Sequence, residues 1–180
     1  MYFAKPGPEN TDETVSLALE TAAARGISHI VVASYSGYSA RKLANDKGIQ
    51  IICVSGANGA DTPGQATMAE SVRRELEACN IPVLSTSHIL SGVERGLSAK
   101  AGGMYPGEIM SHTLRLFGQG TKVCVEAAIM ALDAGLLPYG QPIIALGGTV
   151  KGIDTALIMT PAHAANVLGT KIHEIICKPY

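Results

Sequence analysis

Hydroxyl side chains and a glycine follow the apolar run at residues 30–33. This turn contains Ser34, Ser36, Gly37, Tyr38 and Ser39. A helical pattern starts directly after it, and the first amide groups of a helix, with the positive end of its dipole, attract anions. The residue types therefore predict a phosphate site in a turn between a strand and a helix. The alternative is that Ser39 only caps the helix.

A second glycine-rich stretch follows another apolar run, at residues 143–146. It contains Gly147, Gly148, Thr149, Asp154 and Thr155. In open α/β sheets, ligands bind at the carboxyl ends of the strands, so we favour a ligand site here over a plain tight turn. Asp154 and Thr155 either orient this loop or cap it, and the sequence does not separate the two roles.

Ionisable side chains are concentrated in residues 85–105, where no sustained helical or strand period is evident. The cluster consists of His88, Glu94, Arg95 and Lys100. His88 is the candidate for acid–base catalysis because imidazoles titrate near neutral pH, and Arg95 is a candidate anion contact. We expect a long irregular loop that closes over the ligand. A solvated, flexible loop without that role is the alternative.

Two charged residues, Lys122 and Glu126, are spaced i, i+4 in a segment that otherwise has the pattern of an apolar helix. Residues at this spacing share a helix face. We therefore predict an ion pair on the solvent side rather than a catalytic pair.

The other histidines and the cysteines show no metal-ligand spacing. The isolated histidines, which we predict to be structural, are His29, His112, His163 and His173. The cysteines are Cys53, Cys79, Cys124 and Cys177. They lie far apart in apolar or helical settings, so we expect small buried side chains rather than disulfides or a zinc site.

Apolar patterning predicts the elements that position these residues. Helices are expected at 10–26, 40–47, 67–79, 106–117 and 121–135, and strands at 29–33, 49–54, 82–84, 143–146, 156–159 and 173–177. Capping-box patterns begin at Asn10 and Thr67, and Thr121 is the expected cap of the most apolar helix. The order βαβαβ, then helices, then a hairpin-like return predicts a three-layer α/β/α sandwich.

Length and composition bound the remaining possibilities. The 180 residues fit one domain, 1–180, and 47% of them are hydrophobic, which suits buried parallel strands. A net charge of −1 gives no general attraction to nucleic acid or to a membrane surface. The first residues lack the pattern of a signal peptide, so we expect a cytoplasmic protein. The sequence leaves open whether it forms a homo-oligomer.

Two of these stretches resemble the C-terminal, effector-binding domain of pyruvate kinase: residues 21–41, and residues 143–149 with Gly152, Asp154 and Thr155. Further strings resemble the small stand-alone family of pyruvate-kinase α/β-domain-like proteins along nearly the whole chain. These strings are Asn10-Thr11, Ser36-Gly37, Thr86-Ser87-His88, 90–95, 102–106, 117–120 and 174–179.

The resemblance implies a mostly parallel sheet of order 3-2-1-4-5, with the fifth strand antiparallel. In pyruvate kinase the two loops hold the phosphates of a sugar bisphosphate, which implies a small phosphorylated ligand here. For the stand-alone family the implied ligand is flavin mononucleotide (FMN), with no assigned reaction. The alternative is a sugar-phosphate-sensing regulatory module without catalysis. Pyruvate kinase activity is not expected, because the sequence contains no catalytic barrel.

Overall fold

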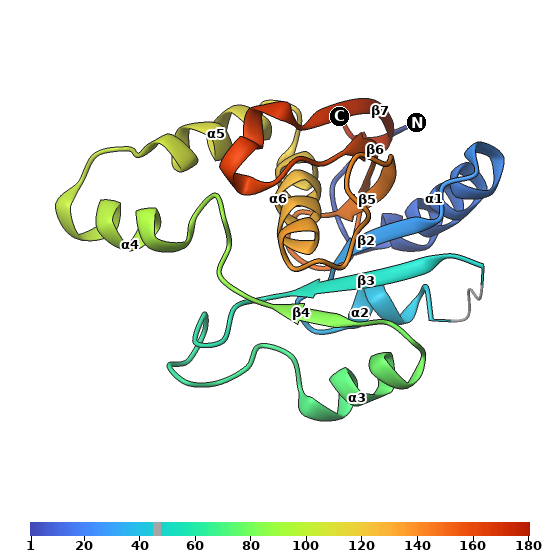
Figure 1. The fold of residues 1–180 in the computed structure, drawn as a ribbon, viewed down its shortest axis with the longest axis horizontal. Coiled ribbons are helices and arrows are strands. Elements are labelled where there is room, and N and C mark those ends of the chain that lie inside the picture. The colour runs from blue at the N-terminus through green and yellow to red at the C-terminus, as the bar shows by residue number, and fades with distance from the viewer. Residues whose placement is uncertain (45–47) are drawn as a thin grey trace.

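The computed structural model describes residues 1–44 and 48–180, and in this part of the chain seven strands form one mixed sheet (Figure 1). The strands are β1 (Tyr2–Phe3), β2 (His29–Ala33), β3 (Gln50–Ser55), β4 (Val83–Ser85), β5 (Ile143–Gly147), β6 (Thr155–Thr160) and β7 (Lys171–Pro179). Their order across the sheet is β1-β7-β6-β5-β2-β3-β4.

The five central strands confirm the expected order 3-2-1-4-5. Strand β2 pairs in parallel with both β3 and β5, and β3 pairs in parallel with β4. Strand β6 runs antiparallel to β5, as expected for the fifth strand. Strand β7 then adds antiparallel to β6, and the short β1 adds parallel to β7. Strand β7 confirms the strand expected at 173–177, β1 is a strand that the sequence did not predict, and the two extend the sheet beyond the five-strand order.

Helices cover both faces of the sheet and complete the α/β sandwich. They are α1 (Thr11–Arg25), α2 (Tyr38–Arg41), α3 (Glu70–Ala78), α4 (Gly92–Ala101), α5 (Pro106–Arg115) and α6 (Gln119–Asp133), with 3₁₀ helices at Pro8–Asn10 and Ala164–Gly169. Alternate residues of β2 face opposite sides: Ile30 and Val32 pack with α1 and α3, whereas Val31 packs with α6. Two apolar clusters, one on each face, form the core.

Several element boundaries differ from the expected ones because side chains take other partners. The Asn10 amide donates to the Lys5 carbonyl (2.8 Å) and the Thr67 hydroxyl to the Gly56 carbonyl (3.4 Å), so neither caps a helix. Helix α3 consequently begins at Glu70. Helix α6 begins at Gln119, and the Thr121 hydroxyl donates back to Phe117 (3.1 Å).

Two other expected boundaries also move. The helix expected to reach about Lys47 ends at Arg41 as α2, and residues 45–47 lie outside the described part of the chain. Helix α5 ends at Arg115 rather than at Phe117. Its expected start is confirmed, with Pro106 in the first turn.

Residues 85–105 are not the irregular loop that the sequence predicts, because Gly92–Ala101 forms helix α4. This helix buries no residue, so it has no apolar stripe from which a helical period could be recognised. It is fixed instead by polar contacts with α5: the Ser98 hydroxyl donates to Glu108 (2.7 Å), and Glu94 accepts from the Glu108 amide (3.2 Å). In Figure 1, α4 and α5 extend to one side of the sheet.

Among the described residues, no helix combines the length and apolar character needed to cross a membrane.

Candidate functional site

A cavity of about 370 Å³ lies at the carboxyl ends of β2, β3 and β5. Its walls come from the turn after β2, the end of β3, the loop after β5, and helices α4, α5 and α6. Strand β2 is the point where the strand order reverses direction, between β3 on one side and β5 on the other. Ligands of open α/β sheets bind in the crevice at such a point.

The turn after β2 contributes Ser34, Ser36, Tyr38 and Ser39 to the cavity wall. The buried Ser34 hydroxyl accepts hydrogen bonds from the amides of Ser39 (3.1 Å) and Ala40 (3.3 Å). Ser34 therefore satisfies the second and third amides of α2 through its side chain. These two amides are occupied within the protein and do not face a ligand as donors.

Gly37 belongs to the same turn but does not line the cavity. Its backbone has a φ of 86°, a conformation that favours glycine. A Cβ at this position would lie 2.4 Å from Val72 Cγ1 of α3. Gly37 thus permits close packing of the turn on α3, and the structure gives no contact between this residue and the cavity.

In the loop after β5, too, some of the predicted residues line the cavity and others pack against the rest of the protein. Gly148 and Thr149 line the cavity, whereas Gly147 packs against α6, where a Cβ would lie 2.6 Å from the Gly120 carbonyl oxygen. Asp154 and Thr155 are buried outside the cavity.

The Asp154 carboxylate connects the loop after β5 to the rest of the protein. It accepts hydrogen bonds from the Thr149 hydroxyl (3.1 Å), the Thr155 hydroxyl (2.9 Å) and the Gly7 amide (3.2 Å). Of the two roles that the sequence left open, Asp154 has the orienting one. It positions Thr149 at the cavity without lining the cavity itself.

From residues 85–105, His88 and Arg95 both reach the cavity. Arg95 comes from α4, and His88 from the segment that precedes it. The other two ionisable residues of the predicted cluster, Glu94 and Lys100, do not line the cavity.

The prediction of a solvent-side pair at Lys122 and Glu126 is wrong. Both line the cavity from α6, and only 5% and 4% of their side chains are exposed. Helix α6 is buried along nearly its whole length. The apolar pattern of this segment was the signal in the sequence, because a helix that is apolar on most sides offers no solvent face for an ion pair.

Glu126 is held from three directions. Its carboxylate accepts hydrogen bonds from the Lys122 ammonium and, at 2.9 Å, from the Leu90 amide, and His88 Nδ1 lies 3.5 Å from Oε2. Burial by itself would raise the pKa of Glu126, but His88 and Lys122 outweigh burial and lower that pKa to about 2. Burial lowers the pKa of Lys122, and the Glu126 carboxylate offsets part of that effect. Glu126 is therefore a carboxylate at neutral pH.

Cations outnumber carboxylates around the cavity. Its lining includes Arg95, Arg115, Lys122 and Lys151, and Glu126 is the one carboxylate that the described residues contribute to it. Arg115 donates to neutral partners, Gln119 (2.6 Å) and Ser111 (2.7 Å). Arg115 and Arg95 are close enough to Lys122 to contribute to the lowering of its pKa. Such an arrangement attracts anions.

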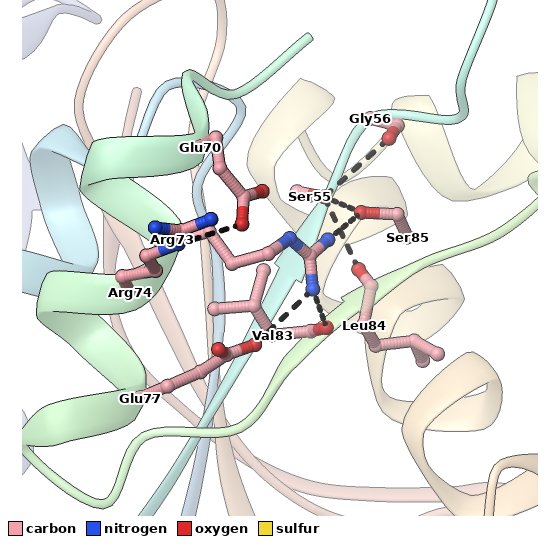
Figure 2. A network of polar contacts seen from close by, with 9 residues as sticks. All are labelled: Ser55, Gly56, Glu70, Arg73, Arg74, Glu77, Val83, Leu84 and Ser85. Carbon is pink, nitrogen blue, oxygen red and sulfur yellow. Dashed lines mark hydrogen bonds and ion pairs between the residues drawn. The ribbon is translucent and has the colours of Figure 1, made fainter. Parts of the chain in front are cut away.

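A polar network supports the cavity at the end of β3 (Figure 2). Ser55 lines the cavity, and its hydroxyl lies 2.5 Å from that of Ser85 in β4. Arg73 of α3 donates to Ser85 and to the Val83 carbonyl (2.8 Å), as Figure 2 shows. Arg73 does not line the cavity, and it fixes the relative positions of α3 and the β4 edge.

The cysteines and the histidines other than His88 do not line the cavity. No group of three or more His, Cys, Asp or Glu residues suited to a metal ion occurs in the described parts of the chain. Cys53, Cys124 and Cys177 are buried as expected, and burial raises the pKa of Cys53 to about 12. The expectation fails for Cys79, which is exposed at the end of α3.

The strand order and the position of the cavity define an open α/β sandwich with a cavity at the point where the strand order reverses, which is where ligands of this class of sheet bind. The family model described as "Pyruvate kinase, alpha/beta domain" matches residues 12–159. The chain belongs to this family. The match spans the turn after β2, the loop after β5 and all of α6, so every wall of the cavity falls within it.

Proposed function

We propose that the protein binds a small phosphorylated molecule in the cavity and that FMN is the first candidate. The observation that carries the proposal is the charge of the lining, where four cations face one carboxylate. That carboxylate, Glu126, is already bonded to Lys122, which leaves Arg95, Arg115 and Lys151 to attract an anionic group. Guanidinium groups suit phosphate because they donate two parallel hydrogen bonds.

The size and the remaining lining are compatible with a nucleotide of this kind. A volume of about 370 Å³ falls within the range of roughly 300–1,000 Å³ that is usual for small-molecule sites. The Ser36 hydroxyl is available to a polar chain, and the Thr149 hydroxyl, which donates to Asp154, can still accept a hydrogen bond. Tyr35 and Tyr38 offer aromatic faces to a planar ring. When bound, FMN supplies electron and hydride transfer.

The phosphate position differs in one respect from the site that the sequence predicts. Since Ser34 occupies the Ser39 and Ala40 amides, a phosphate at the turn after β2 would not use those two donors, and the cation beside the turn is Lys151. The Lys151 ammonium lies 5.2 Å from the centre of the Tyr38 ring, which places it beside this turn. The Arg95 and Arg115 side of the cavity offers a second position.

Fluorescence titration tests the proposal. FMN should be quenched on binding, and riboflavin, which lacks the phosphate, should bind more weakly. Arg95→Gln should weaken FMN binding about tenfold, because a hydrogen bond to a charged group contributes roughly 1.5–3 kcal/mol. Lys100→Gln is the matched control, since it removes a cation from the same helix outside the cavity. An FMN signal that wild-type protein leaves unchanged would contradict the FMN proposal.

A regulatory module that binds a sugar bisphosphate is the second candidate. The observation that favours it is the separation of the cations into Lys151 beside Tyr38 and a group of Arg95, Arg115 and Lys122, which suits two anionic groups. A ligand that binds only the folded state raises the melting temperature as its concentration increases. Stabilisation by sugar bisphosphates together with no response to FMN would favour this candidate.

A further inference from the structure

His88 and Glu126 approach each other at the wall of the cavity although they come from distant parts of the sequence. His88 precedes α4, whereas Glu126 lies in the middle of α6. The imidazole Nδ1 is 3.5 Å from Glu126 Oε2, and 40% of the His88 side chain is exposed. His88 thus combines a buried carboxylate partner with access to the cavity, since both residues line it.

The surroundings of Glu126 keep it ionised and fixed in orientation. The Leu90 amide donates to Oε1 at 2.9 Å, so the backbone two residues after His88 is tied to the same carboxylate. The Lys122 ammonium donates to Oε2. Each carboxylate oxygen thus has a donor within the protein, and His88 Nδ1 approaches Oε2 as a further neighbour.

We propose that His88 and Glu126 form a proton-transfer dyad that acts on the ligand of the cavity. A carboxylate that accepts from Nδ1–H leaves the Nε2 lone pair free to take a proton. His88 is then the general base, and Glu126 is a positioning residue that stabilises the imidazolium. Lys122 holds Glu126 in the charged state. The distance of 3.5 Å is long for a hydrogen bond, and such contacts commonly tighten when a ligand binds.

The step is a reversible proton transfer. A proton leaves the ligand for Nε2, the electron pair of the broken bond stays on the ligand, and the return of the proton restores both partners. No oxidant or second reactant is needed. The substrate class is a phosphorylated small molecule with an acidic proton, such as one on carbon beside a carbonyl group, and this substrate class rests on the proposed function.

The charged groups around His88 are consistent with this assignment. Besides Glu126, the charged side chains that line the same cavity are Arg95 of α4, Arg115 of α5, Lys122 of α6 and Lys151 of the loop after β5. All four are cations that favour an anionic ligand. Glu126 is therefore the one group of this set that stabilises a positive charge on His88.

The structure contains an internal reference for the proposed dyad. His163 Nδ1 lies 2.7 Å from Asp133 Oδ1, and neither residue lines the cavity. This pair is a shorter His–carboxylate contact that lies away from the cavity. The His163 signal is therefore a reference for the tautomer of His88 in the same sample.

Nitrogen-15 NMR of the histidine rings tests the dyad without a ligand. In spectra recorded at alkaline pH, wild-type His88 should carry its proton on Nδ1. In Glu126→Gln, the Gln amide group should donate to Nδ1 and shift the proton to Nε2, while the His163 signal stays unchanged. The double variant Lys122→Met/Glu126→Gln provides a second measurement in a protein without a buried unpaired charge. A wild-type His88 with its proton on Nε2 would overturn the dyad.

Diethyl pyrocarbonate provides a chemical readout, because it modifies an unprotonated imidazole nitrogen. The His88 rate, measured by peptide mass spectrometry, should fall at least threefold in both Glu126 variants, with the exposed His112 unchanged as the internal control. An unchanged His88 rate in both variants would also overturn the dyad. Saturating FMN should protect His88. If FMN does not protect His88 of the wild-type protein and its fluorescence is not quenched, the FMN proposal is wrong and the dyad proposal still stands.

Discussion

Two ion pairs with the same i, i+4 spacing lie in entirely different surroundings. Arg74 and Glu70 on α3 are 2.9 Å apart, with 75% and 65% of their side chains exposed. Lys122 and Glu126 on α6 are 5% and 4% exposed. The spacing fixes only that each pair shares one face of its helix. What lies against that face determines whether the pair is a solvated surface feature or part of a ligand cavity.

The two pairs should therefore differ in energetic character. An exposed i, i+4 pair contributes about 0.3–0.5 kcal/mol, since water screens both charges. A buried pair contributes little beyond what an apolar replacement would, but loss of one partner leaves a buried charge uncompensated. The following predictions test this contrast, beginning with the largest expected effect.

Lys122→Met should destabilise the protein by about 3–5 kcal/mol, because Glu126 loses its buried cation. Urea unfolding followed by circular dichroism measures the loss. Arg74→Met is the matched control on α3 and should cost less than about 0.5 kcal/mol. Equal small losses in the two variants would mean that water reaches Lys122 as freely as it reaches Arg74.

The free energy of unfolding at acid pH should depend on Glu126. Its pKa is about 2 in the folded protein against an ordinary value of 4.5, so the unfolded state binds the proton first. The stabilisation is complete above pH 4.5 and is lost as the pH falls towards 2. It amounts to about 3 kcal/mol at 1.36 kcal/mol per pH unit.

Urea unfolding of wild type and Glu126→Gln between pH 6 and pH 2.5 measures the contribution of ionised Glu126 to the free energy of unfolding. The difference between the two proteins should shrink steadily on acidification. Arg74→Met should run parallel to wild type over the same range. A Glu126→Gln curve parallel to wild type would show that Glu126 gains no stabilising contact on folding.

The double variant Lys122→Met/Glu126→Gln should recover most of the stability lost in Lys122→Met. It removes both charges and keeps an oxygen that can accept from the Leu90 amide. A double-mutant cycle from the four urea curves should give a coupling energy of at least about 3 kcal/mol, at or above the upper end of the usual range for contacting residues. Simple additivity would mean that the two side chains act independently.

Salt should give the smallest effect. At 0.5 M NaCl the small cost of Arg74→Met should disappear, because exposed charges are screened. The cost of Lys122→Met should change little. Urea unfolding at low and high salt measures both, and a strong salt response of Lys122→Met would indicate a solvated pair on α6.

Some features of the cavity could be predicted from local sequence. The turn after β2 and the loop after β5 were both placed at strand ends, and Ser36, Tyr38, Gly148 and Thr149 do line the cavity. Apolar runs that end in glycine and hydroxyl residues mark such positions directly. The roles of these residues in binding remain predictions.

Helix α4 could not be predicted from periodicity, because it has no buried face and is fixed by Ser98 and Glu94 contacts with α5. Gly37 and Asp154 look like ligand residues in sequence, yet one packs on Val72 and the other positions Thr149. Val72 is remote from Gly37 in sequence, and Asp154 is held in place by the Gly7 amide, which is also remote in sequence.

The sequence by itself determined the succession of the central strands along the chain, the strand ends at which the cavity forms and the burial of α6, because these follow from apolar runs and the turns between them. The order of the strands across the sheet came from the family resemblance. Only the tertiary structure decided that Lys122 and Glu126 face inward and that His88 meets them there. The physical reason is that local spacing specifies which residues share a helix face, whereas the packing of α6 beneath strands far away in sequence specifies what that face contacts.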